Sequence, residues 1–227
     1  MDSPRSAVAS PLHTALVVMI LAGWAGYSAL RSAHARAQGG NLLLTYGASM
    51  LLEAALFTVV VCGARWREIF GPRKGAAQLW RDIGVAIVFW LASAIALSIL
   101  SKALGAPSTI KNLAYLLPRT TPEKIMWVLL SITAGVCEET IFRGYLQRQF
   151  EAFSRSALLG IVLSATLFGA GHIYQGPRPA LVIGCYGAMF SALAYWRKSI
   201  RPGIFAHAWQ DSLAGLLANM LEKLPRA

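Results

Sequence analysis

The chain has 227 residues, of which 56% are hydrophobic and only 14% are charged, and its mean hydropathy is +0.52. Soluble domains carry about a quarter charged residues, so this composition excludes a soluble globular protein and predicts one that lies mostly in lipid. The net charge of +11 does not indicate nucleic-acid binding, because the basic residues lie in short loops between apolar runs, without an aromatic-basic platform or a helix-turn-helix pattern.

Seven apolar segments, each close to the ~20 residues that a bilayer-spanning helix needs, predict an all-α fold: a polytopic transmembrane helical bundle of about seven spans, with six to eight as the range. The segments are 12–30, 42–63, 82–101, 123–145, 156–173, 178–196 and 202–221. The first has an alternative interpretation as a signal peptide, because Ala35-Arg36-Ala37 resembles a cleavage site. Its apolar core exceeds the usual length of roughly 7–15 residues, so we favour a retained helix.

No internal repeat or low-complexity tract divides the chain. We expect a disordered N-terminus at 1–11, transmembrane helices without motifs at 12–119, and a transmembrane core that carries all the polar motifs at 120–222. Three cysteines lie far apart in apolar runs, without the paired spacing of a disulfide framework or a zinc site. They are Cys62, Cys137 and Cys185.

The distribution of Lys and Arg predicts the orientation in the membrane. One side would hold twelve of the 21 basic residues: Arg5, Arg65, Arg67, Arg73, Lys74, Arg81, Arg143, Arg148, Arg155, Arg197, Lys198 and Arg201. The positive-inside rule then places the N-terminus and the 64–81 loop in the cytoplasm. Because no eukaryotic targeting signal is visible, we expect a prokaryotic inner (cytoplasmic) membrane.

Two adjacent acids, Glu138 and Glu139, lie inside the apolar fourth segment. A charge at membrane depth costs roughly 2.5–3.5 kcal/mol on insertion scales, so such residues indicate a functional site. Glu139 and Arg143 are spaced i, i+4 and can form an ion pair, while Glu138 is rotated away by about 100° and has no local counter-ion. A partly desolvated carboxylate of that kind can act as a general base or acid near neutrality. The alternative is an ion pair that merely locks two helices together.

Later segments supply candidate partners. His172 closes a run of small residues that permits close helix approach, and His207 and Asp211 are again spaced i, i+4. A carboxylate one turn from a histidine fixes the ring tautomer. The alternatives are an interfacial histidine and a polar pair that stabilises the bundle. Glu53, in the second segment, has no apparent partner and is interpreted only as an unexplained polar residue or a helix–helix contact.

These residues together indicate hydrolase chemistry inside a bilayer, because a glutamate with a histidine can polarise a water while a second polar pair stabilises an oxyanion. In chain order, the motifs are Glu138-Glu139-x-x-x-Arg143, Phe168-x-x-x-His172 and His207-x-x-x-Asp211. This set resembles the CPBP family of intramembrane proteases, which includes the type II CAAX prenyl endopeptidases and bacteriocin-processing and immunity proteins. The resemblance covers roughly 120–222.

The resemblance implies a role for each motif. Glu138 and His172 would activate the attacking water, Glu139 and Arg143 would pair and hold the active helix, and His207 with Asp211 would stabilise the oxyanion. Many relatives carry Asn in place of Asp211, and an ionised Asp is a poorer donor. Asp211 would therefore be protonated, or it would orient His207, which alone would donate.

The family has also been described as metal-dependent. Two glutamates and two histidines could bind zinc, yet the chain has no His-Glu-x-x-His helix. We therefore favour a glutamate-type mechanism without a cofactor, and zinc is the alternative.

One spacing conflicts with the predicted segments. A helix that begins near 156 would carry His172 about 24 Å from its start, at 1.5 Å per residue, whereas Glu138 lies nearer the cytoplasmic end of its own segment. Either the fourth helix runs on past Arg143 towards Phe153, or the fifth helix is short and sunken.

The sequence thus predicts an intramembrane endopeptidase that hydrolyses a peptide bond in a membrane-associated or lipidated protein or peptide. Its partners would be the lipid bilayer and that substrate, with no nucleic acid and an oligomeric state left open. One alternative is a proton- or cation-coupled transporter, against which the lack of inverted repeats argues. The other is a non-proteolytic membrane immunity or binding protein.

Overall fold

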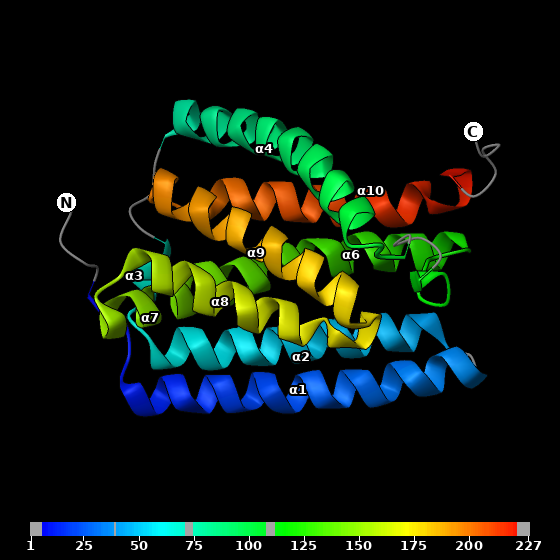
Figure 1. Cartoon of the computed structure of the whole chain (residues 1–227), viewed down its shortest axis with the longest axis horizontal. Coiled ribbons are helices and arrows are strands. Elements are labelled where there is room, and N and C mark those ends of the chain that lie inside the picture. The colour runs from blue at the N-terminus through cyan, green and yellow to red at the C-terminus, as the bar shows by residue number, and fades with distance from the viewer. Residues whose placement is uncertain (1–5, 39, 71–74, 108–111, 222–227) are drawn as a thin grey trace.

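The computed structural model describes residues 6–38, 40–70, 75–107 and 112–221, and every regular element in these ranges is a helix. The helices lie side by side along the long axis of the molecule (Figure 1). Their bounds are α1 Pro11–Gln38, α2 Leu42–Gly63, α3 Trp66–Phe70, α4 Ala76–Ala103, α6 Thr121–Glu138, η1 Glu139–Leu146, α7 Gln147–Ser154, α8 Ala157–Gly171, η2 Ile173–Gln175, α9 Pro177–Arg197 and α10 Arg201–Leu221.

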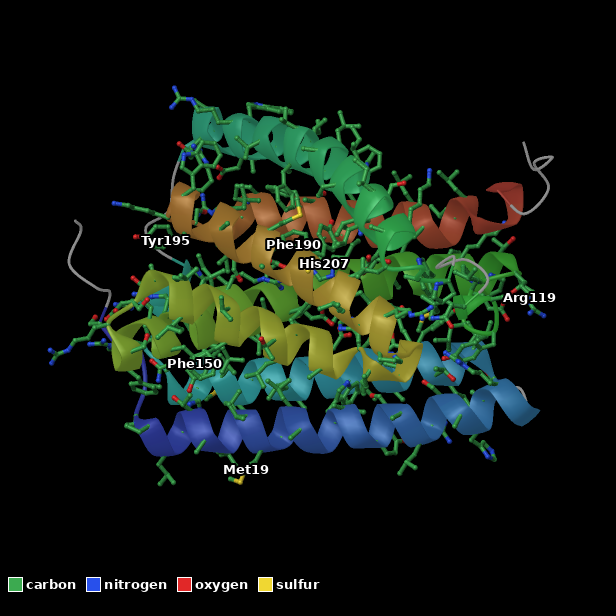
Figure 2. All side chains as sticks on the ribbon, in the orientation of Figure 1. Met19, Arg119, Phe150, Phe190, Tyr195 and His207 are labelled. Carbon is green, nitrogen blue, oxygen red and sulfur yellow. The ribbon has the colours of Figure 1, made fainter. Side chains whose placement is uncertain are left out.

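The predicted all-α membrane bundle is confirmed, and a helix occupies each of the seven predicted segments. Five helical stretches are long and apolar enough to cross a membrane: α1, α2, α4, α9 and the continuous run of α6, η1 and α7. The remaining two predicted segments correspond to α8, with 15 residues, and α10, with 21. Large apolar side chains point outward from these helices, as Met19 does from α1 (Figure 2), because lipid is their solvent.

The length of the fourth helix bears on the conflict between the predicted depths of His172 and Glu138. It runs without a break over 34 residues, from Thr121 to Ser154, and so continues past Arg143 as one of the two alternatives predicted. It begins at a capping box between Thr120 and Glu123, and it ends at Arg155, whose left-handed conformation (φ 54°) closes the helix. The 15-residue α8 is also short, as the other alternative expects, and its depth in the membrane stays a prediction.

In its middle this helix widens into the π-helix η1, and all eight residues of η1 are buried. A π-helix is rare and occurs most often at functional sites. Here it lies at the centre of the bundle, packed against α2, α3, α8 and α9. A helix that is covered on every side can hold charged side chains only if neighbouring helices satisfy them.

The predicted orientation needs one correction. Arg143 was counted with the basic residues of one side although it lies inside the predicted segment 123–145; its side chain is fully buried in η1, where it pairs with Glu139. Eleven basic residues then remain on that side. Three of them, Arg5, Arg73 and Lys74, lie outside the described residues. The cytoplasmic N-terminus stays a prediction.

The segment before α1 docks on α7 through one side chain. The Oε1 atom of Gln149 accepts hydrogen bonds from the backbone N–H groups of Val8, at 2.6 Å, and Ala9, at 3.2 Å. Its Nε2 atom donates to Ala9 O, at 3.0 Å, and to Thr14 Oγ1, at 2.6 Å. Val8 is 2% exposed, so the chain is already held in place before α1 begins. Of the N-terminus at 1–11, residues 1–5 lie outside the described part.

We expect Gln149→Ala to lower the free energy of unfolding by about 1–3 kcal/mol, because it leaves buried backbone groups without partners. The measurement is equilibrium unfolding in detergent micelles. Thr58→Ala, which removes an exposed hydroxyl on α2, is the matched control and should change this value by about 0.5 kcal/mol or less. Equal effects of the two substitutions would contradict the importance of this contact.

Candidate active site

The predicted site residues come from three parts of the bundle. Glu138 is the last residue of α6, and Glu139 and Arg143 follow in η1. His172 caps the C-terminus of α8, and His207 and Asp211 lie in α10. Figure 2 shows His207 beside Phe190, near the middle of the bundle.

A close approach of α6 and α10 brings the glutamates to His207. A Cβ added to Gly135 would lie 3.0 Å from both the Ala208 side chain and the Ile204 carbonyl oxygen, so the two helices pack backbone to backbone there. The contact is fixed further along by Trp127, whose Nε1 donates to the Asp211 carbonyl oxygen at 2.7 Å. Gly135 lies one turn before Glu139, so this packing sets the distance between the acids and the histidine.

Glu139 and Arg143 form the ion pair that their spacing predicts. Arg143 Nη1 lies 2.8 Å from Glu139 Oε1, and neither side chain is exposed. Arg143 Nη2 also donates to the Gly187 carbonyl oxygen of α9 at 3.2 Å. The guanidinium carbon lies 4.3 Å from the ring centroid of Phe168 and 5.0 Å from that of Phe190. Arg143 is therefore held by α8, α9 and its own helix at once.

His207 is in contact with three carboxylates. Its Nδ1 lies 3.1 Å from Glu139 Oε1, and its Nε2 lies 3.4 Å from Asp211 Oδ2. The same Nε2 is 3.6 Å from Glu138 Oε2. An ionised carboxylate only accepts hydrogen bonds, so an imidazolium that donates from both nitrogens satisfies this arrangement.

Glu138 is the least constrained acid of the group. Its side chain is 20% exposed, whereas that of Glu139 is completely buried. Among the described residues, Glu138 Oε2 has no hydrogen-bond partner. The Asp211 side chain is 38% exposed. These two carboxyl groups therefore face the accessible side of the site, and Glu139 faces its interior.

The structure does not bring His172 into contact with Glu138. Within the described ranges, no hydrogen bond or ion pair joins them; the Phe168 ring packs against both His172 (4.9 Å between centroids) and His207 (6.2 Å). His172 Nδ1 lies 2.8 Å from the Phe168 carbonyl oxygen. Because a carbonyl oxygen only accepts, Nδ1 carries the proton of this contact, and Nε2 is the ring nitrogen that can accept a hydrogen bond.

Sequence reasoning missed the residues that shape the surroundings of the ion pair. Phe190 stacks near both Arg143 and His207, and nothing distinguishes it from other apolar residues of α9. Gly203 leaves room for the carboxylate, since a Cβ there would lie 2.6 Å from Glu139 Oε2. Gly187 does the same for Phe168, at 2.9 Å. These positions require glycine because of contacts with residues on other helices, which no sequence spacing reveals.

The side chains present do not fit a metal site. In the part of the chain that the structure describes, no group of three or more His, Cys, Asp or Glu residues has the arrangement to hold a metal ion. The Glu139 carboxylate, the most central of the candidate ligands, is already bound by Arg143 and His207. We therefore derive no reaction step through a metal.

A known family model matches the part of the chain that holds this site. The model is described as type II CAAX prenyl endopeptidase Rce1-like and matches residues 120–213, which are thus similar to the CPBP proteins that the motifs resemble. The matched range begins at the cap of α6 and ends just after Asp211, so it contains all six predicted site residues, and the resemblance seen in the motifs is confirmed. No curated protein and no solved structure matches the chain.

We expect Arg143→Met to destabilise the protein by about 3–5 kcal/mol, because it leaves the Glu139 charge buried without its partner. Equilibrium unfolding in detergent measures this. Arg67→Met, at an exposed position of α3, is the control and should stay within about 0.5 kcal/mol. Adding Glu139→Leu to Arg143→Met should restore part of the loss, and a further loss on addition would show that the ion pair is not what Arg143 contributes.

Gly203→Ala should lower any activity of the site by roughly 10-fold or more, because the added methyl group displaces the Glu139 carboxylate from His207. Gly171→Ala is matched to it: that glycine lies next to His172, but a Cβ there meets nothing within 4 Å. Turnover and thermal stability of the two variants are compared. Equal activity in both would mean that the position of the Glu139 carboxylate does not matter.

Proposed function

We propose that the protein is an intramembrane endopeptidase that hydrolyses a peptide bond in a membrane-associated or lipidated protein or peptide, with a water activated by Glu138. The observation that carries this proposal is that the adjacent acids Glu138 and Glu139 differ in burial and in partners. Arg143 binds Glu139 in the interior, whereas the Glu138 side chain is 20% exposed. The Glu138 Oε2 atom lies 3.6 Å from His207 Nε2 and has no hydrogen-bond partner among the described residues. A carboxylate that is not engaged in a hydrogen bond and lies beside a cationic network can act as a general base.

In the proposed first step, Glu138 removes a proton from a water molecule and the water oxygen attacks the scissile carbonyl carbon. His172 assists by accepting a hydrogen bond from that water through Nε2, the nitrogen left free by the contact of Nδ1 with Phe168. Since the two residues are not in contact, the water would lie between them. A positioned base of this kind contributes about 10²–10⁴-fold to a rate.

His207 is the proposed donor to the oxyanion that develops on the carbonyl oxygen. Its contacts with carboxylates on both nitrogens favour the doubly protonated ring, and one such donor contributes about 10²–10³-fold. Asp211 Oδ2 lies 3.4 Å from His207 Nε2, and the Asp211 side chain is partly exposed. This supports the alternative in which Asp211 orients His207 and His207 alone donates.

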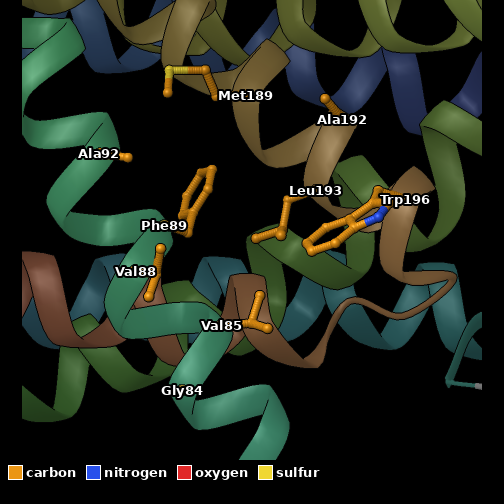
Figure 3. Close-up of a pocket in the computed structure, with 9 residues that line it drawn as sticks. All are labelled: Gly84, Val85, Val88, Phe89, Ala92, Met189, Ala192, Leu193 and Trp196. Atoms are coloured by element: carbon orange, nitrogen blue, oxygen red, sulfur yellow. The ribbon is translucent and has the colours of Figure 1, made fainter.

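An apolar groove beside the site is the proposed seat of a lipid chain on the substrate. It lies between α4 and α9 and has a volume of about 600 Å³. Figure 3 shows Phe89, Leu193 and Trp196 around this space. The ring of Phe89 packs against Phe190 at 4.9 Å between centroids, and Phe190 in turn packs against His207 at 5.4 Å. The rings of Phe89 and Phe190 thus separate the groove from His207. The prenyl endopeptidases of the family name suggest an isoprenoid as the occupant of the groove.

The first experiment measures cleavage of a panel of quenched peptides, each prepared with and without a prenyl group, by purified protein in detergent. Wild type, Glu138→Gln and Glu68→Gln are compared, each with and without a chelator. We expect wild type to cleave prenylated peptides preferentially. Glu138→Gln should reduce turnover by about 10²-fold or more because it keeps the shape and removes the base.

Glu68→Gln removes an acid on α3 outside the site and should leave turnover unchanged. Loss of activity with chelator would replace the metal-free step by metalloenzyme chemistry. Activity retained in Glu138→Gln would remove Glu138 from the mechanism. If wild type cleaves no peptide of the panel, the endopeptidase proposal is wrong for these substrates, and binding or transport becomes the better interpretation.

A further inference from the structure

Glu53 lies at the centre of the face that α2 turns towards the site. The buried residues of α2 are Tyr46 and Val60, and Glu53 is seven residues from each, which places all three on one stripe of the helix. The Tyr46 ring packs edge-on against Trp127 of α6 at 5.5 Å between centroids. Val60 belongs to the same buried cluster as Ile141 of η1. The stripe therefore faces α6 and η1.

The two helices run in the same direction, so Glu53 can be placed along α6 (Figure 1). Seven residues of α-helix rise about 10.5 Å. The same rise from Trp127 ends at Ala134, one turn before Glu138. The spacing thus brings the Glu53 carboxyl group to the level of the candidate active site, on the face of α6 that packs against α2.

The charges around Glu53 are those of the site itself. Its electrostatic neighbours are Glu138, Asp211 and His207. Its Oε2 atom is buried and, among the described residues, has no hydrogen-bond partner. The Cys137 thiol also interacts with Glu53. Burying a carboxyl group at membrane depth without a hydrogen-bond partner costs free energy. Such a group is therefore expected to serve a ligand or the reaction.

Counting charges indicates which acid holds a proton. Four acids lie at this level of the bundle: Glu53, Glu138, Glu139 and Asp211. The cations among them are Arg143 and an imidazolium at His207. Arg143 is bound to Glu139, and His207 contacts both Glu138 and Asp211 directly. Adjacent carboxylates in apolar surroundings cannot all ionise, so the acid without an ion pair of its own in the described structure, Glu53, is the one that stays neutral.

We propose that Glu53 is the general acid of the reaction and protonates the leaving amine. The proposal rests on the endopeptidase function set out above. After water attack the proton of the water is on Glu138; as the C–N bond breaks, its electron pair goes to nitrogen, which takes the Glu53 proton. Glu53 then recovers a proton from Glu138 through water, so the net reaction is amide plus water to acid plus amine. Two carboxyl groups in different environments divide base and acid roles between them.

The test compares an amide with an ester at the same bond. The substrate is the quenched peptide that wild type cleaves best, together with its depsipeptide twin, in which an ester replaces the scissile amide. An amine leaves only if it is protonated, whereas an alcohol leaves far more readily. Glu53→Gln should therefore lower kcat for the amide by about 10²-fold or more and change kcat for the ester by about threefold or less.

Two further variants define the comparison. Glu138→Gln should abolish hydrolysis of both substrates, because both need the attacking water. Tyr46→Phe lies on the same stripe of α2 and loses a hydrogen bond to the Leu116 carbonyl oxygen, so any effect it has should be equal for amide and ester. Ester hydrolysis also reports directly that the Glu53 variant is folded and inserted.

An unchanged amide rate in Glu53→Gln, or an equal loss for amide and ester, would overturn the general-acid role. If Glu53→Gln does not fold, the same ratio is measured in Glu53→Asp, which keeps the acid but withdraws it by one methylene. A selective fall for the amide supports the proposal there, and an equal fall overturns it. Failure of wild type to cleave any amide would instead refute the endopeptidase function, and the role of Glu53 with it.

Discussion

The buried ion pair between Glu139 and Arg143 is the constraint on which the rest of the site depends. A buried ion pair is stable only when both charged partners are present and their remaining hydrogen-bonding groups are also satisfied. Arg143 meets this condition through the Gly187 carbonyl and the rings of Phe168 and Phe190, so α8 and α9 are committed to their positions by one guanidinium group. Glu139 reaches across to His207, which commits α10 as well. The pair therefore assembles the helices and leaves Glu138 as the acid that is not used for structure.

The same arrangement explains why the site can lie within an apolar bundle. The acids are graded by access: Glu139 is enclosed, Glu138 is partly exposed, and Asp211 lies nearest to solvent. His207 stands between them and can be a cation because it has an acceptor on each nitrogen. The polar groups are thus confined to a small network whose members share partners, while the outer faces of the helices remain apolar for contact with lipid.

Much of this could be predicted from the sequence because it depends on local spacing. Two pairs lie within one helical turn each, Glu139 with Arg143 and His207 with Asp211. The seven apolar segments follow from the length of each apolar run. The surroundings could not be predicted, because Phe168, Phe190 and Gly203 reach the site from separate helices. In a membrane bundle both the buried and the lipid-facing positions are apolar, so periodicity does not reveal which phenylalanine packs on the arginine. Arg143 was counted with the basic residues of the loops for a related reason: a basic residue near the end of an apolar run resembles a loop residue.

The π-helix also sets the rotational phase between the two halves of the fourth helix. The half before η1 is aligned to α10 through Gly135, and the half after it is aligned to the N-terminal segment through Gln149. A single residue inserted or deleted within Glu139–Leu146 would turn one half against the other by about 100°, and the two alignments could not both be kept. Over these eight residues the protein therefore depends on a fixed chain length.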